Sequence, residues 1–178
     1  MSNAAGVLLA AGAGTRYGMP KAAAAQGQWL ETAVAALAEG GCADVVVVLG
    51  AALVEVPPPA RAVIASDWAD GMSASVRAGI EAIGSADLAV LHTVDTPDIG
   101  ADVVRRVLAA AQESPAGLAR AVYGSRPGHP VVVHRRHWPQ LLQSLSGDRG
   151  AGPFLRSRPD VVTVDCADLA TGRDIDES

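Results

Sequence analysis

A glycine-rich turn and two basic residues lie near the start of the chain, in the run LLAAGAGTRYGMPK over residues 8–21. The apolar residues 6–10 predict a buried strand, and the small residues that follow allow a phosphate chain to approach backbone N–H groups. Arg16 and Lys21 add positive charge beside the turn. This combination is suited to binding the phosphates of a nucleoside triphosphate.

Residue spacing excludes two common phosphate-binding loops. A Walker loop has Lys directly after Gly and before Ser or Thr, whereas Lys21 lies between Pro20 and Ala22. A dinucleotide-binding turn opens directly into a helix and is followed by an acidic residue at the end of a second strand, about 20 residues later. Here Met19 and Pro20 interrupt an early helix, and no such acid follows. A structural turn with incidental basic residues is the remaining alternative.

The segment LAAGAGTRYGMPK resembles the signature LAAGxGxRxGxPK of sugar-nucleotide and cofactor nucleotidyltransferases, and later segments resemble the molybdenum-cofactor group of that family, the MobA/MocA-like enzymes. The resemblance implies that Arg16 and Lys21 act catalytically by neutralising the triphosphate. The nucleotide contacts that it implies at the strand end and the turn come from Leu9, Ala10, Ala11, Gly12, Ala13 and Gly14, together with both basic residues.

An acidic residue, Asp95, follows the predicted strand 88–94, and functional groups of α/β sheets gather at the carboxyl ends of strands. The segment VDTPDI over 94–99 resembles the family's DxP element, whose aspartate coordinates magnesium. The resemblance therefore implies that Asp95 is a catalytic ligand of Mg²⁺. The structural alternative is a cap on the helix that begins near Gly100, a role that we assign to Asp98.

The C-terminal segment GRDIDES, residues 172–178, partly resembles the family's DIDTPED element, which returns a second acid to the metal. Motif position implies Asp176 as the ligand, with Asp174 as the alternative. Glu177 and Ser178 replace the usual Thr-Pro, so an acidic tail without a metal role is an equally favoured interpretation.

The segment GMSAS over residues 71–75 resembles the GMxxS element of the molybdenum-cofactor cytidylyltransferases. Ser73 and Ser75 lie at the head of a predicted helix, where hydroxyls and free N–H groups can receive a nucleotide oxygen. The resemblance implies nucleotide binding by both serines, while an ordinary N-cap role for Ser73 is equally favoured.

Two further segments, GHPV at 128–131 and GDRGAG at 147–152, resemble the GHPV and GDxGAR elements that border the family's acceptor pocket. They imply acceptor contacts from His129, Asp148 and Arg149. Gly152 departs from the pattern, since the family has Arg there, and Arg149 is the candidate to supply the missing charge. The remaining histidines of this region, His134 and His137, are expected at the surface.

Taken as a family member, the chain is expected to be a nucleotidyltransferase that uses Mg²⁺ and a nucleoside triphosphate. Ala11, where guanylyl enzymes more often have Gly, favours CTP over GTP. The implied acceptor is a phosphorylated small molecule such as molybdopterin, and a molybdoenzyme or its chaperone is an implied partner. Two alternatives are a nucleotide-binding accessory protein of cofactor maturation without turnover and, less favoured, an NADP-dependent reductase.

The composition restricts the other classes of function. A net charge of −5 without a basic run argues against nucleic-acid binding. The chain has neither a cationic leader nor an apolar run near 18 residues, so we expect no membrane span and a cytoplasmic location. Cys42 and Cys166 are too few for a disulfide framework and are expected as buried, reduced residues.

Apolar runs and amphipathic segments alternate along the chain. This order predicts one α/β domain over residues 1–178, with a Rossmann-like nucleotidyltransferase fold, a mostly parallel central sheet and helices on both faces. The predicted strands are 6–10, 45–49, 61–65, 88–94, 118–123, 131–134 and 161–164. The predicted helices are 28–39, 73–83, 100–112 and 138–145.

Overall fold

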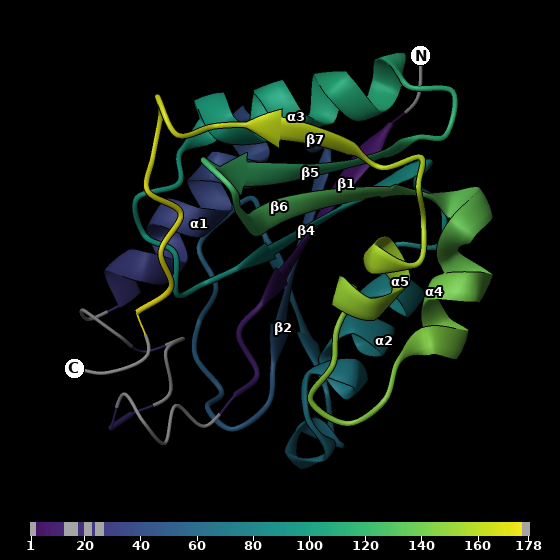
Figure 1. Ribbon diagram of the computed structural model, residues 1–178. Coiled ribbons are helices and arrows are strands. Elements are labelled where there is room, and N and C mark those ends of the chain that lie inside the picture. The colour runs from purple at the N-terminus through teal and green to yellow at the C-terminus, as the bar shows by residue number, and fades with distance from the viewer. Residues whose placement is uncertain (1–2, 13–17, 20–22, 24–26, 176–178) are drawn as a thin grey trace.

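Figure 1 presents a computed structural model of the chain, which describes residues 3–12, 18–19, 23 and 27–175. Within these residues, seven strands form one sheet in the order β3-β2-β1-β4-β6-β5-β7. β6 runs antiparallel to both of its neighbours, and the other strand pairs are parallel. The predicted mostly parallel α/β fold is confirmed.

The strands are β1 (Ala4–Leu9), β2 (Asp44–Leu49), β3 (Arg61–Ile64), β4 (Leu88–Thr93), β5 (Leu118–Tyr123), β6 (Arg126–His134) and β7 (Val162–Asp165). The helices are α1 (Gln28–Glu39), α2 (Met72–Ala82), α3 (Ala101–Glu113), α4 (Trp138–Ser144) and α5 (Gly152–Arg156), with short 3₁₀ turns at Trp68–Asp70 and Arg135–His137.

Helices cover both faces of the sheet, with α1 and α3 on one face and α2, α4 and α5 on the other (Figure 1). Successive side chains of a strand point to opposite faces, so in β1 Leu8 packs toward α1 and α3, while Val7 and Leu9 pack toward α2. Continuous apolar runs such as VVVVL in β2 fit this two-sided burial.

The hairpin between β5 and β6 differs most from the sequence prediction. β6 begins at Arg126 and not at residue 131, because a turn at Gly124, with φ +69°, pairs Tyr123 with Arg126. The register shifts between Arg120 and Val122, which marks a bulge. This hairpin places the GHPV segment on a strand beside β4.

Both cysteines, Cys42 and Cys166, are buried and free, as predicted. Burial raises the pKa of Cys42 to about 12, so its thiol stays protonated. The prediction of a surface position for His137 is wrong, because its side chain is buried and its Nε2 lies 2.8 Å from the carbonyl oxygen of Ala116.

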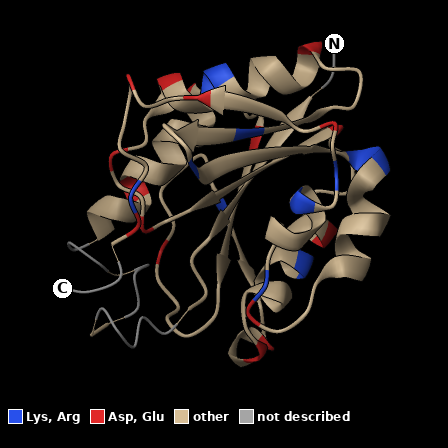
Figure 2. Cartoon of the chain, viewed as in Figure 1, with Lys and Arg blue, Asp and Glu red and all other residues tan. Residues whose placement is uncertain are grey.

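Charged residues of both signs are interspersed over the helices and loops in Figure 2. Each helix in the described part of the chain is too short or too polar to cross a bilayer.

Candidate functional site

Three adjoining cavities lie at the carboxyl ends of β1 and β4, and all three are lined by Leu9 and Met72. Their volumes are about 400, 190 and 220 Å³. The first extends along β1 toward the 3₁₀ turn at Trp68–Asp70, the second reaches Asp95, and the third reaches His129. Because they share two side chains, we treat them as one groove with three parts.

The end of β1 lines the nucleotide side of this groove. The N–H of Ala10 donates to the carbonyl of Val48 over 3.0 Å, and the N–H of Ala51 donates to the carbonyl of Ala11 over 2.9 Å, so the strand end is fixed to β2. A Cβ added to Gly12 would meet nothing within 4 Å, which leaves open space for a ligand. Ala13, Gly14, Arg16 and Lys21 lie outside the described residues.

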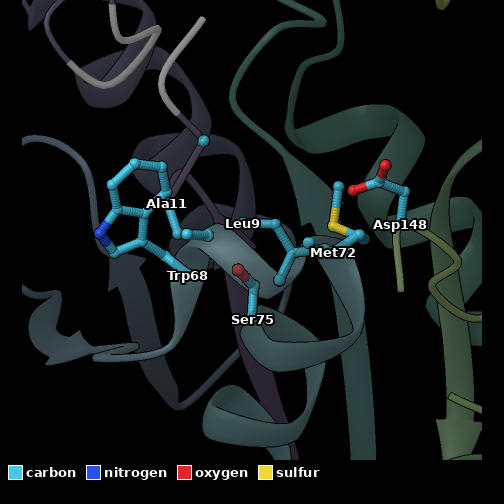
Figure 3. Close-up of a pocket in the computed structure, with 9 residues that line it drawn as sticks. Leu9, Ala11, Trp68, Met72, Ser75 and Asp148 are labelled. Carbon is cyan, nitrogen blue, oxygen red and sulfur yellow. The ribbon is translucent and has the colours of Figure 1, made fainter. Parts of the chain in front are cut away.

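Trp68 lines the 400 Å³ part of the groove and lies beside Ala11 in Figure 3. A Cβ added to Gly50 would lie 2.4 Å from the Cβ of Trp68, so Gly50 allows this close approach of the indole-bearing segment. We did not identify Trp68 from the sequence. The available signal was that few aromatic residues occur in this chain and that one of them lies three residues before the GMSAS segment.

The start of α2 supplies the two predicted serines. Ser75 is buried and lines the 400 Å³ part of the groove (Figure 3). Ser73 lies in the first turn, and its N–H donates to the carbonyl of Gly147 over 3.0 Å. Its predicted alternative role as N-cap is wrong, because Gly71 is the N-cap and no side chain caps the helix.

The loop that carries Asp148 packs against the same helix start. A Cβ at Gly71, where φ is +109°, would lie 2.4 Å from Oδ1 of Asp148, so the loop approaches α2 closely. Asp148 therefore lines both the 400 Å³ part and the 220 Å³ part of the groove. Arg149 is exposed, and its N–H closes the turn on the carbonyl of Ser146 over 3.0 Å.

Asp95 lies directly after β4 and lines the 190 Å³ part of the groove together with Gly12 and Thr93. The backbone of the C-terminal segment returns to this point, since the N–H of Ile175 donates to the carbonyl of Asp95 over 2.9 Å. The segment thus reaches the strand end that carries the predicted metal ligand. Asp176, the other predicted ligand, lies outside the described residues.

Asp98 fixes the C-terminal segment and does not cap α3. Its Oδ2 accepts from the N–H and from the hydroxyl of Thr171, over 2.7 and 2.6 Å. The N-cap of α3 is Gly100, without a side-chain cap, and Oδ1 of Asp102 accepts from the N–H of Val103. The predicted capping role of Asp98 is therefore wrong, because its carboxylate instead binds Thr171, which lies 73 residues later in the chain.

His129 connects the acid groups with the acceptor side of the groove. Burial and then the charge of Arg120 lower the pKa of His129, while Asp95 and Asp174 act in the opposite direction. The tail acid Asp174 therefore lies close enough to His129 to interact with it electrostatically, as Asp95 does. No cluster of three metal-ligating side chains occurs within the described residues. Magnesium usually takes only one or two carboxylates together with substrate phosphates, so the acids present fit it.

Arg120 is a site residue that we missed in the sequence. It lies in β5 among apolar residues and lines the 220 Å³ part of the groove with His129, Asp148 and Gly152. Its Nη2 donates to the carbonyl of Gly128 over 3.3 Å. The predicted acceptor residues His129 and Asp148 thus line the same part of the groove as an arginine, whereas the predicted Arg149 does not line it.

The chain is similar to known proteins in sequence and in fold. The chain matches the family described as "MobA-like NTP transferase domain" over residues 6–162. It is 38% identical to a protein named nicotine blue oxidoreductase from Paenarthrobacter nicotinovorans, over 96% of this chain and 91% of that protein.

Solved structures of the same fold include a manganese complex of Rv0371c from Mycobacterium tuberculosis, with TM-score 0.71, 21% identity and coverage of 98% of this chain and 94% of that one. Another is 2-C-methyl-D-erythritol 4-phosphate cytidylyltransferase from Thermus thermophilus, with TM-score 0.62, 22% identity and coverage of 95% and 91%. The predicted family and the predicted general class of nucleotidyltransferase are confirmed, because the chain belongs to the MobA-like NTP transferase domain family.

Proposed function

We propose that this protein transfers a nucleotidyl group from a nucleoside triphosphate, CTP in preference to GTP, to the phosphate of a small acceptor such as molybdopterin, with Mg²⁺. The observation that carries this proposal is the shared groove. Leu9 and Met72 line all three parts, so Gly12, the acid after β4 and the acceptor residue His129 face connected space.

The reaction needs no covalent intermediate with the protein. An oxygen of the acceptor phosphate bonds to the α-phosphorus, the bond from that phosphorus to the bridging oxygen breaks, and pyrophosphate leaves with the electron pair. An acceptor phosphate is already ionised near neutral pH, so no general base is required. Catalysis then depends on alignment and on neutralising negative charge.

The residues divide these tasks. Arg16 and Lys21 would neutralise the triphosphate, and the turn that begins at Gly12 would hold it through backbone N–H groups. Asp95, with Asp176 or Asp174 from the C-terminal segment, would hold Mg²⁺. The ion would supply further positive charge at the phosphates. The hydrogen bond from Ile175 to the carbonyl of Asp95 supports a tail that reaches this position.

The preference for CTP rests on the side of the groove next to β1. Ala11 lines the part that also contains Trp68, and its methyl group takes space that a glycine would leave free. The indole of Trp68 offers a flat surface on which a base can stack. The cytidylyltransferase among the structures of the same fold is consistent with this preference.

Two measurements test the proposal. Competition of CTP with GTP at equal concentration, with Mg²⁺, should favour CTP, and a clear preference for GTP would contradict the base assignment. Pyrophosphate release from CTP should require molybdopterin or another phosphorylated acceptor. Tight binding of CTP without any release would instead support the accessory role in cofactor maturation, in which the protein would deliver nucleotide or cofactor to a molybdoenzyme or its chaperone.

The 38% identical relative favours a second candidate function, because its name describes an oxidoreductase and the match covers 96% of this chain. In that case a reduced dinucleotide would occupy the groove and would transfer a hydride to an oxidised substrate. An assay that monitors the consumption of NADPH through its absorbance tests this candidate directly. For the cellular location we propose the cytoplasm, which the two free cysteines support.

A further inference from the structure

The 220 Å³ part of the groove, which we call its acceptor part, contains an arginine, Arg120, with a hydrogen-bond donor that is unpaired among the described residues. Nε of Arg120 is fully buried and has no hydrogen-bond partner within the described structure. The long bond from Nη2 to the carbonyl of Gly128, 3.3 Å, is the contact that holds the guanidinium. A buried donor without a partner is unfavourable by about 1–3 kcal/mol, so the site is better satisfied with a ligand present.

The other groups around Arg120 do not neutralise it. No ion pair between described residues includes Arg120. Burial, and after it the charge of Arg156, lower the pKa of Arg120, which places a second cation nearby. Nη1 of Arg156 would lie 3.2 Å from a Cβ built on Gly152, one of the residues that line the cavity.

Asp148, the acid that lines this cavity, lies toward its other end. Its Oδ1 would be 2.4 Å from a Cβ at Gly71, at the start of α2, and in Figure 3 it is next to Met72. The positive charge of the cavity is therefore concentrated on the side of β5 and α5.

We propose that Arg120, which lines this cavity, and Arg156, which is exposed beside the cavity residue Gly152, bind an oxyanion group of the acceptor, such as a phosphate monoester. This assignment rests on the proposed function, because it names the group that the acceptor presents. Arg156 then supplies, from one helical turn further along, the positive charge that Gly152 cannot provide. The fork-shaped guanidinium of Arg120 is well matched to the oxygens of a phosphate.

The rest of the cavity selects the body of the acceptor. Its lining is mainly apolar, from Leu9, Leu91, Val131 and Leu155, and its volume is about 220 Å³. The chemical class that fits is a compact, largely apolar or aromatic molecule with one oxyanion group.

Phenyl phosphate is a suitable probe, because it joins an aromatic ring to a phosphate monoester. We would titrate it by calorimetry into the full chain, with and without saturating Mg²⁺ and the α,β-methylene analogue of CTP. Arg120→Gln and Arg156→Gln should each weaken its binding at least tenfold, since charged hydrogen bonds of this kind change affinity by about ten- to a hundredfold. Arg120→Lys keeps the positive charge but loses the planar guanidinium with its paired N–H donors. Its affinity for phenyl phosphate should lie between those of wild type and Arg120→Gln.

Arg105→Gln is the matched control, because Arg105 is an exposed arginine on α3 that bonds the carbonyl of Glu39. It should bind phenyl phosphate within about twofold of wild type, as one expects for a surface charge outside a site. Wild-type affinity in Arg120→Gln, absence of phenyl phosphate binding by wild type, or a loss confined to Arg149→Gln would each overturn the proposal. If Arg120→Gln does not fold, the same criteria apply to Arg120→Lys and Arg156→Gln.

The design separates this proposal from the function on which it rests. If wild type fails to bind the CTP analogue but binds phenyl phosphate through Arg120, nucleotidyl transfer is contradicted and the oxyanion site is supported. If the CTP analogue binds and phenyl phosphate binding is insensitive to Arg120 and Arg156, the oxyanion site is overturned and the nucleotide site is supported.

Discussion

Gly172→Ala is expected to shift the C-terminal segment relative to the end of β4. Gly172 has φ +64°, in the left-handed region, and a Cβ added to it would lie 2.2–2.4 Å from three carbons of the Tyr123 ring. Carbon atoms in contact are about 3.5–4.0 Å apart, so the closest pair is too close by more than about 1 Å. Either the ring or the segment must move.

The Tyr123 ring is the less movable of the two. It is buried, its hydroxyl donates to the carbonyl of His129 over 2.6 Å, and the guanidinium of Arg126 lies 5.7 Å from its centroid. Crowding in a packed region costs about 1–3 kcal/mol, and a left-handed backbone costs an alanine about 1 kcal/mol more. Together they give about 2–4 kcal/mol for a segment that stays in place.

Release of the segment sets an upper limit on that cost. It would break the two bonds from Thr171 to Asp98, the bond from Ile175 to Asp95 and the two bonds from Arg126 to the carbonyls of Thr171 and Gly172, at about 1 kcal/mol each. Because this total of about 5 kcal/mol exceeds the cost of staying, we expect the segment to remain attached but to shift away from the Tyr123 ring, which moves Asp174 relative to the end of β4. Urea unfolding should give a loss of about 2–3 kcal/mol.

Gly124→Ala is the control, because φ there is +69° and an added Cβ would meet nothing within 4 Å. It should lose only about 1 kcal/mol. Gly172→Ala should in addition need more Mg²⁺ for nucleotide binding, since the segment carries Asp174 and Asp176. Equal losses of stability in the two variants, with equal dependence on Mg²⁺, would refute the reasoning.

Three further predictions concern single side chains. Lys21→Ala should weaken triphosphate binding by about ten- to a hundredfold in calorimetry, since a charged hydrogen bond is lost; an unchanged dissociation constant would remove Lys21 from the site. Asp95→Asn should lower pyrophosphate release at least about a hundredfold, with an unchanged melting temperature, because magnesium coordination is weakened and little packing is lost; normal turnover would show that Asp95 is no ligand. Burial, and then His129, lower the pKa of His92 from 6.5 to about 3, so the unfolded chain binds a proton that the folded chain excludes. Between about pH 6.5 and about pH 3, stability should therefore fall by about 1.4 kcal/mol per pH unit, and His92→Leu should remove that contribution in urea unfolding at pH 7 and pH 5; an identical pH dependence in the variant would contradict it.

The elements of the fold could be predicted from local patterns. The run VVVVL in β2 is long enough for a strand buried on both faces, and α3 has an apolar face of evenly spaced residues. The strand order and the antiparallel direction of β6 could not be predicted in this way. They depend on pairings between residues distant in sequence, such as Leu91 with Val131.

The misassigned residues have the same explanation. Asp98 has the sequence context of a helix cap, but Thr171 returns from the far end of the chain and binds its carboxylate. Arg120 alternates with apolar residues as a solvent-facing strand residue would, yet its face of the sheet lies toward α2 and α5 and lines a cavity. Local patterns indicate which face a side chain occupies but not what covers that face.

A calorimetric titration of the full chain with CTP and Mg²⁺, compared with a titration with NADPH, tests the central claim most directly. We predict saturable binding of CTP that depends on Mg²⁺ and is weakened by Asp95→Asn, and no heat of binding for NADPH. Saturable binding of NADPH without any binding of CTP would contradict nucleotidyl transfer and assign the groove to the oxidoreductase chemistry named for the 38% identical relative.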